Sequence, residues 1–240
     1  MKAFSFSIFV FVIIFNTSVK SQNRLYLQGN GVFFSINKYN FDNSEIFTGK
    51  ENAFKPTFGH PQILAGYKFT LKSAFEIGVI YRINTFNFEG NVKNANNALS
   101  IDLSNSIGIP IRYRYHLNDF SGKNNFRFSL NAGFVTLFQS EINKISQTGK
   151  IDYLPYSITY SPYNFKKISF VGELGLAIEK KISDKLSFSF DYNYWLGFQE
   201  YAKIDLIFKN TTNGSITNGS VLHSGTSHNL SIGLRYTFTD

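Results

Sequence analysis

The feature that most constrains this fold is the strict alternation of side chains from Asn229 to Phe238, near the C-terminus. Every second position carries a large apolar side chain, and the positions between them carry polar residues or glycine. The apolar positions are Leu230, Ile232, Leu234, Tyr236 and Phe238, and the polar set is Asn229, Ser231, Gly233, Arg235 and Thr237. Because successive side chains of a β-strand point to opposite faces, this period of two predicts a strand with one apolar and one polar face.

The same alternation recurs along the chain and predicts an all-β protein with eight strands. Between the strands, Gly, Asn, Asp, Ser and Lys gather in segments that are typical of turns and loops. The expected strands are Arg24–Lys38, Gln62–Leu71, Ala74–Phe86, Ser100–Leu117, Phe126–Phe138, Lys166–Lys181, Leu186 to about Ala202, and Asn229–Phe238.

The connections between these strands alternate in length. Short links are expected after the second, fourth and sixth strands, at Lys72–Ser73, Asn118–Asn125 and Ser183–Lys185. Long loops are expected after the first, third, fifth and seventh strands, at Tyr39–His60, Glu89–Ala98, Gln139–Phe165 and Lys203–Thr226. This rhythm is typical of a transmembrane barrel that has short periplasmic turns and long external loops. An even number of antiparallel strands also closes a sheet without a free edge.

The composition supports a membrane barrel over other classes. Aromatic residues make up 18% of the chain, with 27 Phe and 14 Tyr, which suits the aromatic girdles of such a barrel. A mean hydropathy of −0.13 argues against a helical membrane protein. The net charge of +8 is not gathered into a basic stripe, so it favours an anionic lipid surface or ion pairs in a lumen over nucleic acid. The absence of cysteine excludes disulfides, cysteine metal ligands, a thiol nucleophile and a lipoprotein anchor.

The N-terminus has the pattern of a secretory signal peptide over residues 1–21. A positive start at Met1-Lys2 precedes an apolar run of 13 residues, Ala3 to Phe15, which is too short to span a bilayer as a helix. Val19 and Ser21 fit the −3 and −1 positions of a cut before Gln22. A buried N-terminal helix is the alternative, but Phe, Ile and Val crowd every face of this segment. The barrel domain is therefore expected at residues 22–240, outside the cytoplasm.

The final strand also resembles the C-terminal signal of bacterial outer-membrane β-barrels, in the order polar, x, Gly, x, x, aromatic, x, aromatic. The matching positions are Ser231, Gly233, Tyr236 and Phe238. The whole mature chain resembles small barrels of the outer membrane protein A and X type. The chain departs from that pattern by continuing for two residues after Phe238, and no peptidoglycan-binding domain follows.

The resemblance implies an eight-stranded, antiparallel, up-and-down transmembrane barrel in the outer membrane of a Gram-negative cell. It implies that Gly233, Tyr236 and Phe238 are an assembly signal read by the barrel-assembly machinery. Outer-membrane lipid and lipopolysaccharide are the other expected partners, with an envelope or secretion-system protein as a further candidate. Nucleic acid is not expected as a partner.

If the apolar face of the strands meets lipid, the polar face must line the lumen, where charges require pairing. The expected lumen charges are Lys68, Glu76, Arg82, Arg112, Arg114, Arg127, Glu173, Glu179, Asp191 and Arg235. For Arg235 the expected partners are acids such as Glu173, Glu179 or Asp191. An eight-stranded barrel is about wide enough for side chains alone, so a filled lumen is expected. A soluble lipocalin-like barrel would alternate as well, but the terminal strand and these charges favour the membrane.

The external loops offer the candidate binding residues. Tyr153, Tyr156, Tyr160 and Tyr163 are expected to bind a ligand, because exposed tyrosine gives a large contact area at a small cost in entropy. The alternative is that they extend the strands and the aromatic girdle. No catalytic residue, metal site or cofactor is expected, although His223 with Ser224 or His228 with Ser227 could form a lipid deacylase pair.

Four functions follow from these observations. The first is a non-enzymatic barrel for envelope structure, adhesion or surface binding. The others are an accessory barrel of a secretion or surface-assembly system, a lipid-modifying enzyme and a narrow pore.

Overall fold

The computed structural model describes residues 25–41, 60–92, 95–120, 125–140, 149–153, 156–164 and 166–238. The expected signal peptide, residues 1–21, its cleavage site and most of the first expected loop, Tyr39–His60, lie outside the described residues.

The described chain consists of β-strands and the turns that join them. No helix in these residues is long and apolar enough to cross a membrane. The strands are β1 Leu25–Phe41, β2 His60–Lys68, β3 Ser73–Val92, β4 Ala95–His116, β5 Phe126–Gln139, β6 Gly149–Tyr153, β7 Tyr156–Asn164, β8 Ile168–Lys181, β9 Leu186–Gly197, β10 Ala202–Asn210 and β11 Ile216–Thr237.

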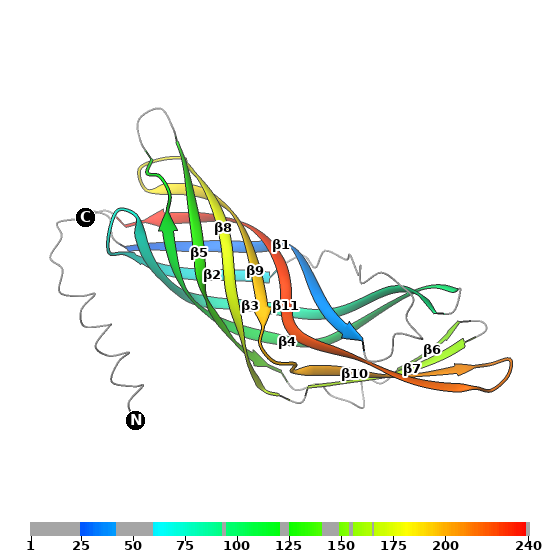
Figure 1. Ribbon diagram of the computed structural model, residues 1–240. Coiled ribbons are helices and arrows are strands. Elements are labelled where there is room, and N and C mark those ends of the chain that lie inside the picture. The colour runs from blue at the N-terminus through cyan, green and yellow to red at the C-terminus, as the bar shows by residue number, and fades with distance from the viewer. Residues whose placement is uncertain are drawn as a thin grey trace, which may run out of the picture.

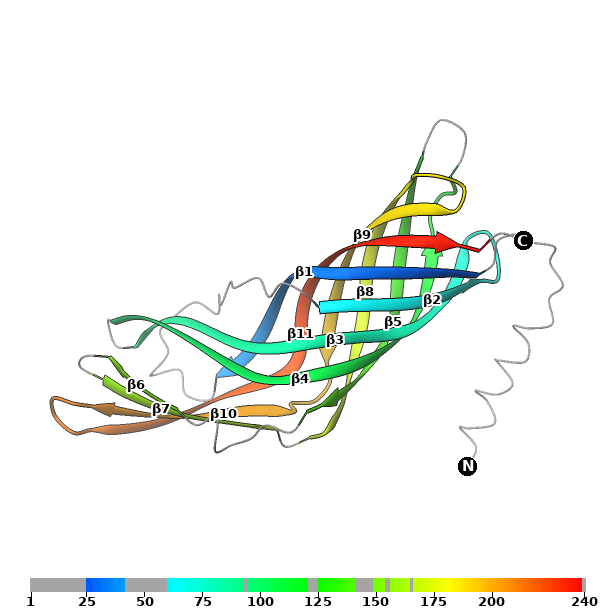
Figure 2. The ribbon, with the colours of Figure 1, turned by 180° about the vertical axis from the view of Figure 1, so that it is seen from behind.

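Eight of these strands close into an antiparallel barrel, so the expected fold class is confirmed. Around the ring the order is β1, β2, β3, β4, β5, β8, β9 and β11, and β11 pairs back with β1. The closing ladder runs from Tyr26 opposite Thr237 to Phe41 opposite Val221. Figure 2 shows this seam, with β1 lying between β11 and β2.

Three further strands form a sheet that extends from the external end of the barrel (Figure 1). The first half of β11 pairs with β10, β10 pairs with β7, and β7 pairs with β6. The loops expected at Gln139–Phe165 and Lys203–Thr226 are therefore wrong over β6, β7, β10 and the start of β11. The loop expected at Glu89–Ala98 is wrong as well, because β3 and β4 continue as a ladder to Val92 opposite Ala95.

These segments are strands because each finds a neighbouring ladder that satisfies its backbone N–H and C=O groups. Their polar, Asn- and Gly-bearing composition suggested loops, since β-propensity reflects packing against neighbours more than an intrinsic backbone preference. In β10 a usable signal was present, because Ala202, Ile204, Leu206 and Phe208 alternate with largely polar residues.

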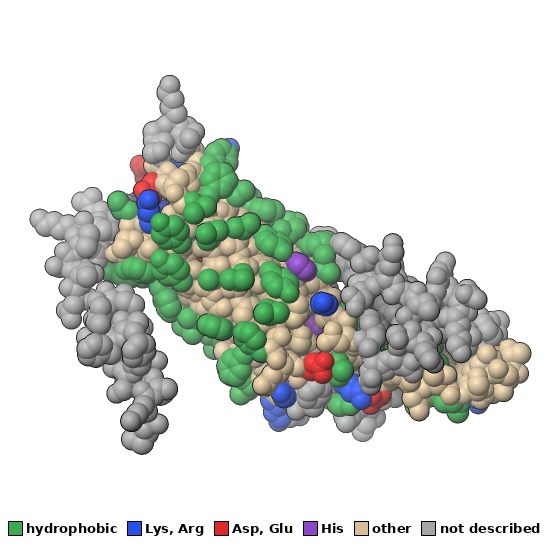
Figure 3. All heavy atoms as spheres, in the orientation of Figure 1, with side chains coloured by type: hydrophobic (Ala, Val, Ile, Leu, Met, Phe, Trp, Pro, Cys, Tyr) green, Lys and Arg blue, Asp and Glu red, His purple; other side chains and the backbone are tan. Residues whose placement is uncertain are grey.

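The barrel wall has an apolar outer face and a polar inner face. One residue from each barrel strand illustrates the outer face, and these eight side chains are 37% to 63% exposed: Leu27, Ile63, Ile77, Ile111, Leu130, Leu174, Phe190 and Ile232. An equivalent inner set is at most 3% exposed: Gln28, Gln62, Glu76, Arg112, Asn131, Glu173, Asp191 and Ser231. Figure 3 shows the hydrophobic side chains spread over the barrel wall, with charged side chains mainly towards its two ends.

Short turns lie at the end of the barrel opposite the external sheet, which is the periplasmic end by the usual asymmetry of such barrels. Between β8 and β9 the Leu186 amide donates to Ser183 Oγ at 3.1 Å, and the Ile182 amide donates to the Leu186 carbonyl at 2.9 Å. Lys181 Nζ lies 2.6 Å from Asp184 Oδ1 in the same turn. Hydrogen bonding and the charge of Lys181 lower the pKa of the exposed Asp184 carboxyl.

β11 bends at Gly225, where it leaves the barrel ring for the external sheet. Gly225 has a φ of 90°, which side chains disfavour. A methyl group at this position would lie 2.9 Å from Val171 Cγ1 and 3.3 Å from Tyr201 Cε1. The bend therefore needs glycine for its backbone angle and for its close approach to the inner wall.

Replacing Gly225 by alanine is expected to lower the free energy of unfolding by about 1–3 kcal/mol, from backbone strain together with the steric clash. Gly214→Ala is the matched control, because Gly214 has a φ of 73° but nothing within 4 Å of the added methyl group. Urea unfolding in lipid vesicles measures both variants. Equal losses for the two would contradict the proposed role of the contact with Val171.

Candidate functional site: the barrel lumen and its two ends

Eight charged side chains meet inside the barrel. They reach the lumen because each occupies an inward position of its strand, while its neighbours in the sequence point outwards. Four are arginines and four are carboxylates, so the set is formally neutral: Arg112 and Arg114 of β4, Arg127 of β5, Arg235 of β11, Glu76 of β3, Glu173 and Glu179 of β8, and Asp191 of β9. All eight are at most 4% exposed. We refer to these eight residues as the lumen network.

Glu179 pairs with three arginines of the lumen network, each within 2.8 Å. Its Oε1 lies 2.8 Å from Arg114 Nη1 and 2.7 Å from Arg235 Nη1. Its Oε2 lies 2.5 Å from Arg127 Nη2. One carboxylate therefore holds guanidinium groups from three different strands together.

Arg114 has the matching role among the cations. Its Nε lies 2.9 Å from Glu76 Oε1, and its Nη2 lies 3.0 Å from Asp191 Oδ1. With Glu179, it contacts acids from β3, β8 and β9. These contacts cross the lumen and fill it with paired charge, which is the arrangement that a low-dielectric interior requires.

Neutral side chains complete the shell around Arg235. The Tyr26 hydroxyl donates to Glu76 Oε1 at 2.6 Å, and the guanidinium of Arg235 lies 4.2 Å from the Tyr26 ring centre. Arg235 Nη2 also donates to Gln28 Oε1 at 2.6 Å. Tyr26 and Gln28 were not among the predicted site residues. The signal was available, because both fall on the polar face of the first strand, opposite Leu25 and Leu27.

An apolar layer lies next to the lumen network on its external side. It consists of the buried residues Val32, Ile80, Val135, Leu137, Val171 and Trp195. These residues come from β1, β3, β5, β8 and β9, and they are at most 5% exposed. The lumen thus holds a charged layer and an apolar layer in succession.

The other two predicted lumen charges lie outside the lumen network, one towards each end. Arg82 is 1% exposed at the external end, 5.0 Å from the Trp195 ring, and it donates to Asn37. Lys68 lies at the periplasmic end, with its Nζ 5.8 Å from the Tyr26 ring centre. Within the described part of the chain neither residue forms an ion pair.

The external sheet has two different faces. Its buried face carries Ile158, Ile204, Leu206, Phe208 and Val221, each at most 4% exposed. Its open face carries Lys203, Asp205, Ile207 and Lys209 of β10, with Tyr163 opposite Lys203. Lys203 Nζ lies 2.9 Å from Asp205 Oδ1, and this hydrogen bond raises the pKa of Lys203.

The structure does not gather the four predicted tyrosines on one surface. Tyr160 pairs with Leu206 and Tyr163 with Lys203, so these two half-buried residues lie on opposite faces of β7. Tyr153 and Tyr156 are partners where β6 meets β7. Of the four, Tyr163 is the one placed on the open face beside β10.

The two His–Ser pairs considered as an alternative do not meet as nucleophile and base. His223 is buried against Tyr39 and Tyr201, with ring centres 4.7 and 5.2 Å apart, while Ser224 Oγ lies 3.0 Å from Thr226 Oγ1. His228 is exposed and bonded to the Tyr192 hydroxyl at 2.8 Å, whereas its neighbour Ser227 is buried. The described residues also contain no group of three metal-binding side chains.

The predicted assembly signal lies at the seam of the barrel. Tyr236 and Phe238 are exposed on the outer face, with ring centres 5.3 Å apart. Gly233 faces Asn30 across the ladder, and a methyl group there would lie 2.5 Å from the Gly29 carbonyl oxygen. The seam is therefore tightly packed inside and aromatic outside.

An apolar wall around a buried network of charges is the reverse of a water-soluble barrel, and a closed sheet leaves no unpaired backbone to face lipid. The protein is a small eight-stranded transmembrane β-barrel that is located in the bacterial outer membrane.

Comparison with known proteins finds only distant similarities. No protein-family model matches the sequence, and no curated protein matches it. Among solved structures, the outer membrane protein OprG from Pseudomonas aeruginosa is similar with a TM-score of 0.49 and 9% identity, covering 91% of this chain and 98% of that one. A major outer membrane protein from Thermus thermophilus gives a TM-score of 0.43 and 12% identity over 90% of this chain and 98% of that one. The E. coli outer membrane protein W gives a TM-score of 0.39 and 10% identity, covering 92% of this chain and 100% of that one. Similarities this low give no basis for transferring a function.

Proposed function

We propose that this barrel is a non-enzymatic surface-binding protein that acts through the open face of its external sheet. The observation that supports the proposal is the two-faced character of that sheet. Its open face combines charged Lys203, Asp205 and Lys209 with Ile207, which is 45% exposed, and Ile216, which is 62% exposed. Apolar side chains exposed among charges on a firmly paired sheet favour contact with a partner.

The contents of the lumen support this proposal over a pore. An ion that entered from the periplasm would have to part the lumen network, in which Glu179 and Glu76 each contact three arginines. It would then meet the apolar layer, whose side chains carry no charge, and hydrophobic constrictions of this kind block conduction. We therefore expect the lumen to hold the barrel rigid and not to conduct.

The test is a photo-activated cross-linker placed at Ile207 on the open face of the external sheet in living cells. We expect one discrete cross-linked product, which Lys209→Glu weakens because it reverses a charge on the same face. The same cross-linker at Leu174 reports lipid contact, and at Lys185 it reports the periplasmic end. Planar-bilayer recordings of the purified barrel are expected to show no steady conductance.

Each rival function has its own outcome in this design. If the cross-linker gives products at Lys185 but none at Ile207, an accessory role in a secretion or assembly system would be favoured over surface binding. A steady conductance in single-channel recordings would favour a pore over surface binding. Altered lipid A or phospholipid profiles in cells that carry His223→Ala or His228→Ala would favour a lipid-modifying enzyme over surface binding.

A further inference from the structure

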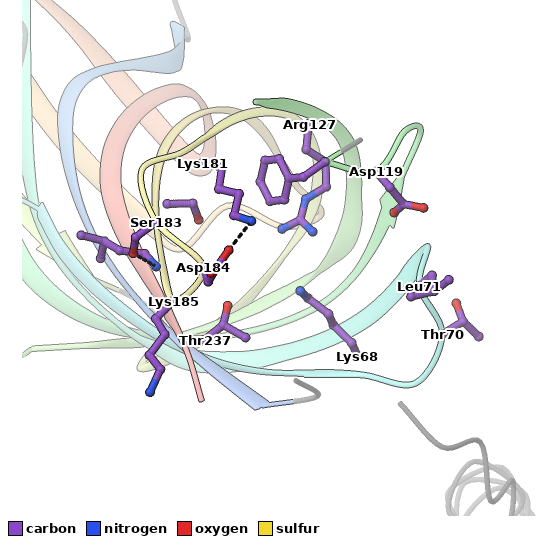
Figure 4. A pocket seen from close by; sticks show the side chains of 13 residues that line it. Lys68, Thr70, Leu71, Asp119, Arg127, Lys181, Ser183, Asp184, Lys185 and Thr237 are labelled. Carbon is purple, nitrogen blue, oxygen red and sulfur yellow. Dashed lines mark hydrogen bonds and ion pairs between the residues drawn. The ribbon is translucent and has the colours of Figure 1, made fainter. Parts of the chain in front are cut away.

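The periplasmic mouth of the barrel contains a cavity of about 360 Å³. It lies beside the turns that join β2 to β3 and β8 to β9, away from the external sheet (Figure 4). Among the described residues, its charged lining consists of four basic residues, Lys68, Arg127, Lys181 and Lys185, and two acidic residues, Asp119 and Asp184. The lining therefore has an excess of positive charge.

The basic groups converge, whereas the acidic groups are occupied or turned away. Figure 4 shows Lys68, Arg127 and Lys181 pointing towards a common centre from three strands. Asp184 is bridged to Lys181 at 2.6 Å, and the carboxylate of Asp119 points away from that centre. What remains at the centre is the charge of Lys68, beside the guanidinium of Arg127, which Glu179 pairs.

Arg127 has a donor left over. The side chain is 4% exposed, and its Nη2 is bound by Glu179 at 2.5 Å. Its Nε has no hydrogen-bond partner among the described residues, and the guanidinium lies 4.4 Å from the Phe120 ring centre. Lys68 likewise forms no ion pair within the described ranges. A buried guanidinium held in place by a carboxylate and an aromatic ring, with one N–H unused, is suited to receive an anionic oxygen.

We propose that this mouth binds a phosphate group. The guanidinium of Arg127 offers a fixed donor, and the ammonium of Lys68 supplies a mobile charge that no carboxylate of the described residues pairs, so both can bond phosphate oxygens. The cavity is large enough for a phosphate carried on a small molecule and is open at the periplasmic end. The lumen network, which includes Arg127, is formally neutral, so the site does not need its ligand in order to fold.

The experiment is titration calorimetry with inorganic phosphate on the full chain in nanodiscs of phosphatidylcholine. The wild type is expected to bind one phosphate with saturation. Arg127→Gln and Lys68→Gln are each expected to weaken binding by about tenfold or more, because each removes a charge-assisted hydrogen bond. Lys180→Gln is the matched control, because Lys180 is an exposed cation at the same end that does not line the cavity. Its affinity is expected to equal that of the wild type.

Arg127→Gln and Lys68→Gln are both expected to fold. After Arg127→Gln, Glu179 still contacts Arg114 and Arg235, and Lys68→Gln removes no ion pair between described residues. Heat-modifiable migration in detergent gels checks folding, and Lys68→Gln carries the test by itself if Arg127→Gln fails to fold. The proposal is overturned if the wild type shows no saturable phosphate binding or if all variants bind equally.

A second set of nanodiscs separates the two sources of phosphate. If the headgroup of phosphatidylglycerol reaches the site, it will compete and weaken the binding of inorganic phosphate. If the affinity is unchanged, the site serves soluble phosphate compounds. Either result supports a phosphate site, and a loss of saturation in the phosphatidylcholine nanodiscs themselves argues against one.

Discussion

Replacing Glu179 by glutamine is expected to lower the free energy of unfolding of the barrel by about 3–5 kcal/mol. The substitution preserves shape and removes charge. It leaves the guanidinium groups of Arg114, Arg127 and Arg235, which Glu179 contacts at 2.5 to 2.8 Å, with one negative charge fewer among them in a dry lumen. Urea unfolding in lipid vesicles, followed by tryptophan fluorescence and gel migration, gives the magnitude.

Two controls separate charge pairing from general damage to the lumen. Glu173→Gln removes an acid that contacts Arg112 at 3.0 Å and forms no other ion pair among the described residues. We therefore expect it to lower the free energy of unfolding by less than Glu179→Gln does. The double variant Glu179→Gln with Arg127→Gln restores formal neutrality and is expected to be more stable than Glu179→Gln alone. If all three unfold at the same urea concentration, pairing in the lumen network does not stabilise the barrel.

Replacing Leu174 by arginine is expected to lower the free energy of unfolding in lipid by about 2–4 kcal/mol, because the new charge must enter the hydrocarbon. Leu174 is 63% exposed on the outer wall and pairs with Ala132 and Tyr194 in the middle of β8. In a water-soluble barrel the same change would be nearly neutral. The measurement is again reversible urea unfolding in vesicles.

Ile207→Arg is the matched control for the lipid-facing substitution. Ile207 is 45% exposed on the open face of the external sheet, outside the barrel wall, so arginine there is expected to change stability by less than about 0.5 kcal/mol. A loss at Ile207 as large as the loss at Leu174 would mean that lipid contact is not what distinguishes the two sites.

Most of the barrel could be predicted from the sequence, because each barrel strand obeys the period of two. The alternation in strands such as Leu186 to Tyr194 assigns both the strand and its faces. The external strands were not predicted, because their ladders lie outside the membrane, where neither face must be apolar and Ser, Thr and Asn are tolerated. Ile207 also interrupts the polar side of β10 and blurs an otherwise clear alternation.

The pairing inside the lumen could be predicted in kind but not in detail. Alternation shows that Arg235 points inwards, but which acid it meets depends on the register of strands far apart in sequence. Arg235 contacts Glu179 at 2.7 Å, as one of the expected acids, and it also contacts Glu76 of β3 at 3.1 Å. Likewise, the spacing of the tyrosines could not place Tyr160 and Tyr163 on opposite faces until residues 156–164 were known to form a strand.

The bend at Gly225 has a consequence for the order of folding. β11 closes the barrel with its second half and supplies the ladder partner of β10 with its first half. The closing ladder joins segments near the two ends of the chain, and contacts of such high sequence separation form late and slowly. Membrane closure and completion of the external sheet are therefore a single late event. A chain stalled before its last strand would have an open edge in the membrane and an unfinished sheet outside it.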